Sequence, residues 1–129
     1  PQAGTETLAR RGLPGRAHVD RSMRLAPLDP RYYAMLGTRA FTHMVVGEDL
    51  AAAEWAERAA RSPGAHVLIA MIASATQAMI GDDAKAAQWA ANVRSRNPVL
   101  TRADFFRAFP MKSEVTRAQV ANALASLGF

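Results

Sequence analysis

The chain has 129 residues, enough for one domain with a hydrophobic core and too few for two ordinary domains. Alanine supplies 28 of these residues whereas Phe, Trp and Tyr together make 7%, a mixture that favours closely packed helices over a β-sandwich. The absence of cysteine excludes disulfide frameworks, thiolate metal sites and cysteine nucleophiles. The net charge of +5, carried by 14 Arg and 2 Lys against 11 acidic residues, hints at an anionic partner such as nucleic acid.

The N-terminal region is expected to precede the regular part of the fold. Residues 1–11 are interpreted as a tail or a truncated helix, and residues 12–28 as a partial copy of a repeat. The sequence opens on Pro1 and carries no visible signal peptide. We therefore expect a piece of a longer, cytoplasmic protein.

Four helices are predicted in the central part of the chain. They are expected over residues 29–46, 48–61, 62–81 and 82–97. Asp29 and Pro30 predict an N-cap and a first-turn proline for the first helix, and Ser62 and Pro63 predict the start of the third.

The third predicted helix needs a membrane test, because residues 62–81 contain no Asp, Glu, Lys or Arg. Pro63, Gly64 and His66 lie within this stretch, and positive flanks and interfacial aromatic residues are missing. A helix that is apolar on nearly every side also suits the centre of a helical domain. We favour this second interpretation and expect no membrane span.

Two further helices are predicted in residues 99–129. Thr101 and Asp104 have the spacing of a capping box before a short helix with three phenylalanines. Ser113 can cap the last helix, and Gly128 can end it. An atypical closing pair of this kind is expected to cap the apolar end of a helical array.

An internal repeat of 34 residues is the main signal in the chain. The residues that recur at this spacing are Gly47 as Gly81, Asp49 as Asp83, Ala52 as Ala86, Ala53 as Ala87, Trp55 as Trp89 and Ala56 as Ala90. The two glycines can end the preceding helices in a left-handed conformation, and the two tryptophans are expected to pack between layers. The full repeats are residues 29–63 and 64–98.

This unit of two helices joined by a Gly turn resembles the tetratricopeptide repeat. Tyr33, Leu36 and Gly37 match the aromatic-x-x-Leu-Gly start of that pattern. The later small residues and the proline of the pattern have counterparts in Ala52, Ala59 and Pro63. The resemblance covers the partial copy and both full repeats. It implies an all-α, right-handed solenoid of antiparallel helix pairs, closed by the C-terminal capping pair.

A narrower resemblance concerns the run LAPLDPRYYAMLG, which spans residues 25–37. It is similar to repeat regions that follow catalytic or DNA-binding domains in bacterial adenylate/guanylate cyclase-like proteins and winged-helix transcriptional regulators. The run from Phe109 to Gly128 is similar to the end of those chains. This resemblance implies the C-terminal part of a larger bacterial signalling or transcription-regulatory protein, without saying which effector domain precedes it.

No pattern in the chain predicts catalysis, a cofactor or a metal. His18, His43 and His66 are far apart in sequence, and the last two are expected to be hydrogen-bonded helix residues. A nucleophile elbow and a phosphate-binding Gly loop are absent from the sequence. The acid pairs at 48–49 and 82–83 suit helix N-termini, where they interact favourably with the helix dipole. We therefore do not expect an enzyme.

Nucleic-acid binding by a helical-repeat protein is the alternative function. The basic residues are spread over the whole chain, and Arg10-Arg11 is the only adjacent pair. No basic run with interleaved aromatic residues occurs. Most Arg side chains are therefore interpreted as solvated helix-face residues.

A protein partner is the leading prediction, because the first helices of stacked pairs line a continuous concave surface. The partner would be a protein or peptide segment held in this groove, or another copy of the chain. The residues predicted to line the groove are Arg31, Ala34, Thr38, Phe41, Thr42, Leu68, Ile72 and Thr76. The competing interpretation is that neighbouring helices cover Phe41, Leu68 and Ile72.

Overall fold

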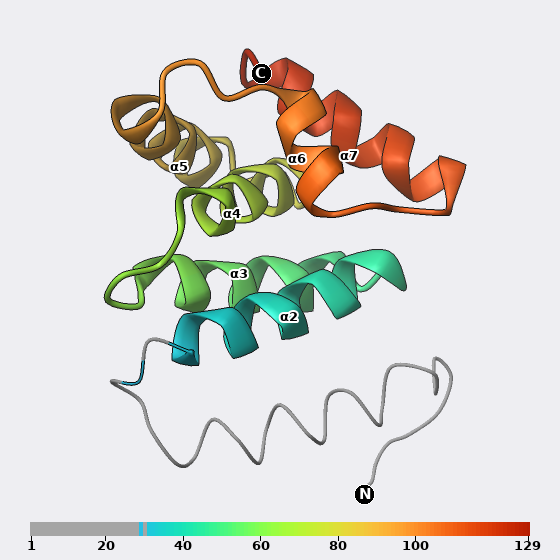
Figure 1. Ribbon diagram of the computed structural model, residues 1–129. Helices are drawn as coiled ribbons and strands as arrows, with labels where there is room; N and C mark the ends of the chain where they lie inside the picture. The colour runs from blue at the N-terminus through green and yellow to red at the C-terminus, as the bar shows by residue number, and fades with distance from the viewer. Residues whose placement is uncertain (1–28, 30) are drawn as a thin grey trace, which may run out of the picture.

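A computed structural model of the chain describes residue 29 and residues 31–129 (Figure 1). The helices in this part are α2 (Tyr32–Val45), α3 (Asp49–Arg61), α4 (Val67–Met79), α5 (Asp83–Arg96), α6 (Arg102–Ala108) and α7 (Glu114–Ser126). This part of the chain contains no strand, which confirms the all-α prediction for it. The tail and the partial repeat predicted before residue 29 lie outside the described residues.

The helices pack around α4. Figure 1 shows α2 and α3 as a neighbouring pair, α4 above them, and α5 and the α6–α7 pair on top of α4. Helix α4 contacts α2, α3, α5 and α7, and nine of its 13 residues are buried. The interpretation of this apolar segment as a central helix is therefore confirmed. None of the helices between residues 29 and 129 combines the length and the apolar character that a membrane span requires.

The 34-residue spacing reappears in the helix boundaries. Helix α3 begins at Asp49 and α5 begins at Asp83, 34 residues later. Gly47 and Gly81 precede these starts with φ angles of 83° and 84°, a left-handed conformation that glycine adopts without steric cost. The prediction that these two glycines end the preceding helices is confirmed.

The first described helix begins slightly later than predicted. Arg31, rather than Asp29, is the N-cap of α2. The Asp29 carboxylate instead accepts a hydrogen bond from the backbone N–H of Arg31 at 2.8 Å, a local turn in which an aspartate bonds two residues ahead. Because this bond forms outside the helix, the regular turns begin at Tyr32.

The predicted start of α4 at Ser62 and Pro63 is wrong. Ser62 has an extended backbone, and Gly64 has a φ of 76°, so the chain turns here instead of continuing as a helix. The helix begins only after His66, whose Nδ1 accepts a hydrogen bond from the N–H of Leu68 at 3.1 Å. A histidine therefore takes the capping role that a serine was expected to fill.

The C-terminal caps agree with the prediction. The Thr101 hydroxyl accepts from the N–H of Asp104 at 3.3 Å, and the Asp104 carboxylate accepts from the N–H of Thr101 at 2.9 Å, which completes the capping box. The Ser113 hydroxyl accepts from the N–H of Thr116 at 3.2 Å. Gly128 follows α7 with a φ of 91°.

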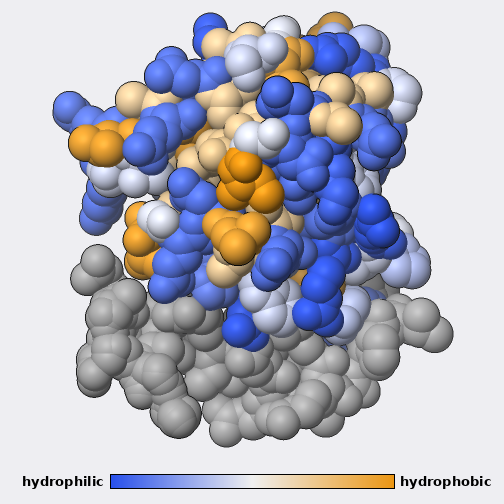
Figure 2. All heavy atoms as spheres, turned by 180° about the vertical axis from the view of Figure 1, so that it is seen from behind, coloured by the Kyte–Doolittle hydropathy of each residue, from blue (hydrophilic) through white to orange (hydrophobic). Residues whose placement is uncertain are grey.

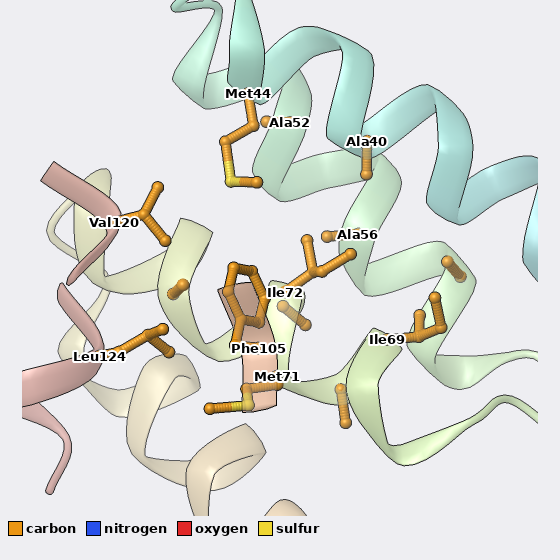
Figure 3. Packing of buried hydrophobic residues seen from close by; sticks show 14 of the residues in the cluster. Ala40, Met44, Ala52, Ala56, Ile69, Met71, Ile72, Phe105, Val120 and Leu124 are labelled. Atoms are coloured by element: carbon orange, nitrogen blue, oxygen red, sulfur yellow. The ribbon is translucent and has the colours of Figure 1, made fainter. Parts of the chain in front are cut away.

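The hydrophobic core has two kinds of contact. Along α3 the buried positions are all alanines, which allow the backbones of neighbouring helices to approach closely. Where α6 and α7 pack against α4, the contacts are made by larger side chains. Figure 3 shows Phe105 of α6 lying among Met71 and Ile72 of α4 and Val120 and Leu124 of α7.

Candidate interaction surface

The structure separates the eight predicted groove residues into three groups. Arg31, Ala34 and Thr38 are exposed on α2. Phe41, Thr42 and Leu68 are half-buried. Ile72 and Thr76 are completely buried, so they belong to the core and offer no surface to a partner.

Helix α6 lies where the apolar side of the groove was expected. The Phe41 ring lies 5.5 Å from the Phe109 ring, and Phe109 in turn lies 5.1 Å from Phe105. Phe105 is fully buried beside Ile72 (Figure 3). Phe109 and Phe105 therefore cover Phe41 and Ile72, respectively. This contact removes apolar surface of both partners from water.

The exposed strip of α2 is already hydrogen-bonded within the chain. The Arg31 guanidinium donates to both carboxylate oxygens of Asp29, at 3.1 and 2.8 Å. These bonds lower the pKa of Asp29 to about 2 and raise the pKa of Arg31. The Thr38 hydroxyl donates to the carbonyl of Ala34 at 2.8 Å. A partner on this strip would therefore meet paired rather than unsatisfied polar groups.

A more open candidate surface lies at the turn between α2 and α3. It is a shallow hollow of about 470 Å³, which we call the acidic hollow. Its lining residues are His43, Glu48, Asp49, Leu50, Ala51 and Glu54. Leu50 is 63% exposed, and nearby in sequence Val45 is 41% exposed. The hollow therefore combines an accessible leucine with three carboxyl groups.

The carboxyl groups of the acidic hollow differ in their surroundings. The Glu48 carboxylate lies 2.6 Å from Nδ1 of the buried His43. Asp49 is half-buried, and its Oδ1 is enclosed without a hydrogen-bond partner among the residues that the structure describes. Burial raises the pKa of Asp49, because a carboxylate loses hydration there. A positive charge brought near Asp49 would offset part of this loss.

The acidic hollow is not among the surfaces predicted from the sequence. The sequence pattern predicts only an interaction of Glu48 and Asp49 with the helix dipole, and it assigns no role to Leu50. A difference between the two repeats could have indicated the hollow, because Ala84 stands where the first repeat has Leu50. A large apolar residue in the exposed first turn of only one repeat is not required by the stacking.

A second hollow of about 390 Å³ surrounds Trp55. The guanidinium carbons of Arg39 and Arg58 lie 3.9 and 4.4 Å from the centre of its ring. Glu57, on the same surface, accepts from Arg61 at 2.8 Å and from Lys85 of α5 at 3.1 Å. Glu57 thus pairs with two cations on this surface, and its ion pair with Lys85 links α3 to α5.

The histidines of the described part take part in hydrogen bonds within the chain. His43 and His66 are both hydrogen-bonded, as predicted, whereas His18 lies outside the described residues. Between residues 29 and 129 no group of three or more His, Cys, Asp or Glu side chains is arranged to hold a metal ion.

Most of the remaining surface is polar. Figure 2 shows hydrophilic side chains over much of one face, interrupted by small groups of hydrophobic ones. Besides Val45 and Leu50, the large apolar residues exposed in the described part are Val99 and Val115. Isolated apolar residues are normal on protein surfaces. We therefore assign to a candidate surface only those that adjoin a hollow or a charged group.

Comparison with known proteins gives no relative for this chain. No protein-family model, no curated protein and no solved structure matches it.

Proposed function

We propose that this chain is a non-catalytic module for protein–protein interaction or self-association, built from tetratricopeptide-like helix pairs. It would form the C-terminal part of a larger cytoplasmic bacterial signalling or transcription-regulatory protein. The resemblance of residues 25–37 to such proteins supports this setting, and the starts of α3 and α5 at a 34-residue interval support the repeat.

The observation that carries the proposal is the acidic hollow. Leu50 is 63% exposed although complete burial of a leucine contributes about 1.5–3 kcal/mol. Glu48, Asp49 and Glu54 surround it and would favour a partner that brings positive charge. A partner with an apolar side chain beside a Lys or Arg would match both features.

The exposed strip of α2 is the second surface that a partner could use. Arg31, Ala34 and Thr38 are accessible there, and the half-buried Phe41 and Leu68 adjoin the core. This strip is what remains of the predicted groove after α6 has covered its apolar side. We place it second because its polar groups are already bonded within the chain.

Site-specific photo-crosslinking in cells tests the proposal. A photoreactive amino acid at position 50, and separately at position 38, is expected to give a crosslinked product of defined mass that contains one protein species. Position 99 is the matched control, because Val99 is 79% exposed and lies outside both surfaces. No product from position 50 or position 38, with the parent protein expressed and folded, would contradict an interaction through either surface.

A further inference from the structure

Opposite charges are gathered in two separate regions of the described chain. Residues 43–54, which form the acidic hollow, contain three carboxylic acids and no Lys or Arg. Residues 102–117, which span α6 and the start of α7, contain four Lys or Arg residues and two acids. One of these four, Arg107, forms an ion pair with Asp104 at 2.8 Å.

The start of α7 combines positive charge with an exposed apolar side chain. Val115 is 70% exposed in the first turn of α7, close in sequence to Lys112 and Arg117. The Arg117 guanidinium carbon lies 4.2 Å from the centre of the Phe106 ring, which holds this cation on the surface of α6. Neither Lys112 nor Arg117 makes an ion pair in the part of the chain that the structure describes. We call Lys112, Val115 and Arg117 the basic edge.

The acidic hollow and the basic edge are complementary in composition. The acidic hollow places exposed Leu50 among carboxylates. In the basic edge, exposed Val115 lies in sequence between Lys112 and Arg117, and Glu114 is the one acid among them. An apolar contact between Leu50 and Val115 would bring Lys112 toward the carboxylates of the hollow. The Lys112 ammonium group would then lie near the exposed carboxylate of Glu54, where opposite charges attract each other.

The two surfaces lie at the same end of the molecule. Figure 1 shows the start of α3 and the start of α7 on the same side of the molecule. A two-fold axis at this end would place the hollow of one copy against the basic edge of the other, twice in each dimer. In such a dimer the hollow and the basic edge of both copies are all occupied, so no further copy can be added through them.

We infer that the chain forms a two-fold dimer in which the acidic hollow of each copy receives the basic edge of the other. This inference rests on the proposed function, since it names a second copy as the partner. Matching charge and exposed apolar residues favour this partner over an unrelated one because both halves of the contact occur in one chain.

Charge reversal combined with sedimentation analysis tests the inference. Glu54→Lys and Lys112→Glu are each expected to raise the dimer dissociation constant roughly tenfold or more, since each brings like charges together. The variant that carries both substitutions restores opposite charges at each contact and is expected to return to within about threefold of the original value. Asp83→Lys is the matched control, because Asp83 is exposed at the start of α5 outside both surfaces and should leave dimerisation unchanged.

Each other outcome has a definite meaning. A chain that stays monomeric up to millimolar concentration would overturn the dimer, and crosslinking from position 50 to a different protein would then leave the proposed function standing. A dimer that is insensitive to Glu54→Lys or Lys112→Glu, or is not restored in the combined variant, would overturn the assignment of these surfaces. Circular dichroism of each variant separates loss of folding from loss of association.

Discussion

The helix pairs α2–α3 and α4–α5 and the C-terminal pair α6–α7 build the same core from different side chains. In α3 the buried residues are Ala52, Ala53, Ala56 and Ala59. In the C-terminal pair they include Phe105, Phe106 and Leu124. Helix α3 therefore packs by close approach of backbones, whereas α6 and α7 contribute bulky side chains that fill the remaining space.

This difference explains why the predicted groove is closed. The repeat leaves an apolar surface on α2 and α4, and a seven-residue helix with three nearby phenylalanines is well suited to cover it. Phe109 reaches Phe41, and Phe105 reaches the centre of the core beside Ile72. The acidic hollow, which is formed at a turn, stays open instead.

The largest expected effect comes from emptying the C-terminal side of the core. Phe105→Ala should lower the free energy of unfolding by about 3–5 kcal/mol, because it removes a fully buried ring and leaves a cavity. This loss is a large fraction of the stability of an ordinary small domain. Urea denaturation followed by circular dichroism measures it.

The control for this prediction is Val99→Ala. Val99 lies shortly before α6 and is 79% exposed, so its truncation should change the free energy of unfolding by less than about 0.5 kcal/mol. A Phe105→Ala variant as stable as this control would show that α6 does not contribute to the core.

A smaller effect is expected from overfilling the repeat region. Ala53 and Ala87 occupy the same position in the two repeats, yet Ala53 is fully buried and Ala87 is exposed. The carbonyl of Ala53 also accepts a hydrogen bond from the buried Gln77 of α4 at 3.3 Å. Ala53→Leu should therefore cost about 1–3 kcal/mol of unfolding free energy, because the added methylenes force α3 and α4 apart.

Ala87→Leu is the matched control at the equivalent repeat position. Its side chain would point to solvent, and Leu and Ala both favour helices, so the change should stay within about 0.5 kcal/mol. Thermal unfolding of the two variants in parallel provides the measurement. Equal destabilisation would mean that α3 and α5 are packed alike, contrary to their burial.

More of the structure of the repeat region than of the C-terminal region could be predicted from the sequence. Local signals fix its helices, because glycine turns, acidic first turns and a 34-residue period all act within a few residues of the chain. The boundary at Ser62 and Pro63 was misplaced by more residues than the start of α2, because serine before proline resembles a helix start. Gly64 and the His66 cap decided the structure instead.

The candidate surface could be predicted less well, because it depends on which elements meet in space. Phe105 and Phe109 were predicted to lie on a short helix, but no local signal shows that this helix packs near Phe41 and Ile72. Burial of the two groove positions, Ile72 and Thr76, follows from such contacts between segments distant in sequence. The exposure of Leu50 likewise depends on which segments of the chain pack beside the start of α3.

The smallest expected effect concerns two aspartates, one at the start of each region. Asp29 has a pKa of about 2 chiefly because the Arg31 side chain donates to it. The pKa of Asp104 is lowered chiefly by the backbone N–H of Thr101 in the capping box, with Arg107 second. Arg31→Ala should therefore raise the pKa of Asp29 markedly, whereas Arg107→Ala should leave more of the Asp104 shift in place.

The pH dependence has the same sign for both residues but a different sensitivity to salt. A carboxyl whose pKa is lowered in the folded state stabilises the fold above its usual pKa near 3.8, and this contribution is lost as the pH falls toward the lowered value. Salt screens the exposed Arg31 pair more than a bond to a backbone N–H. Carboxyl NMR titrations at low and high NaCl concentration should thus move the pKa of Asp29 upward further than that of Asp104. An equal upward movement of both would show that the capping box is held by charge as much as the ion pair is.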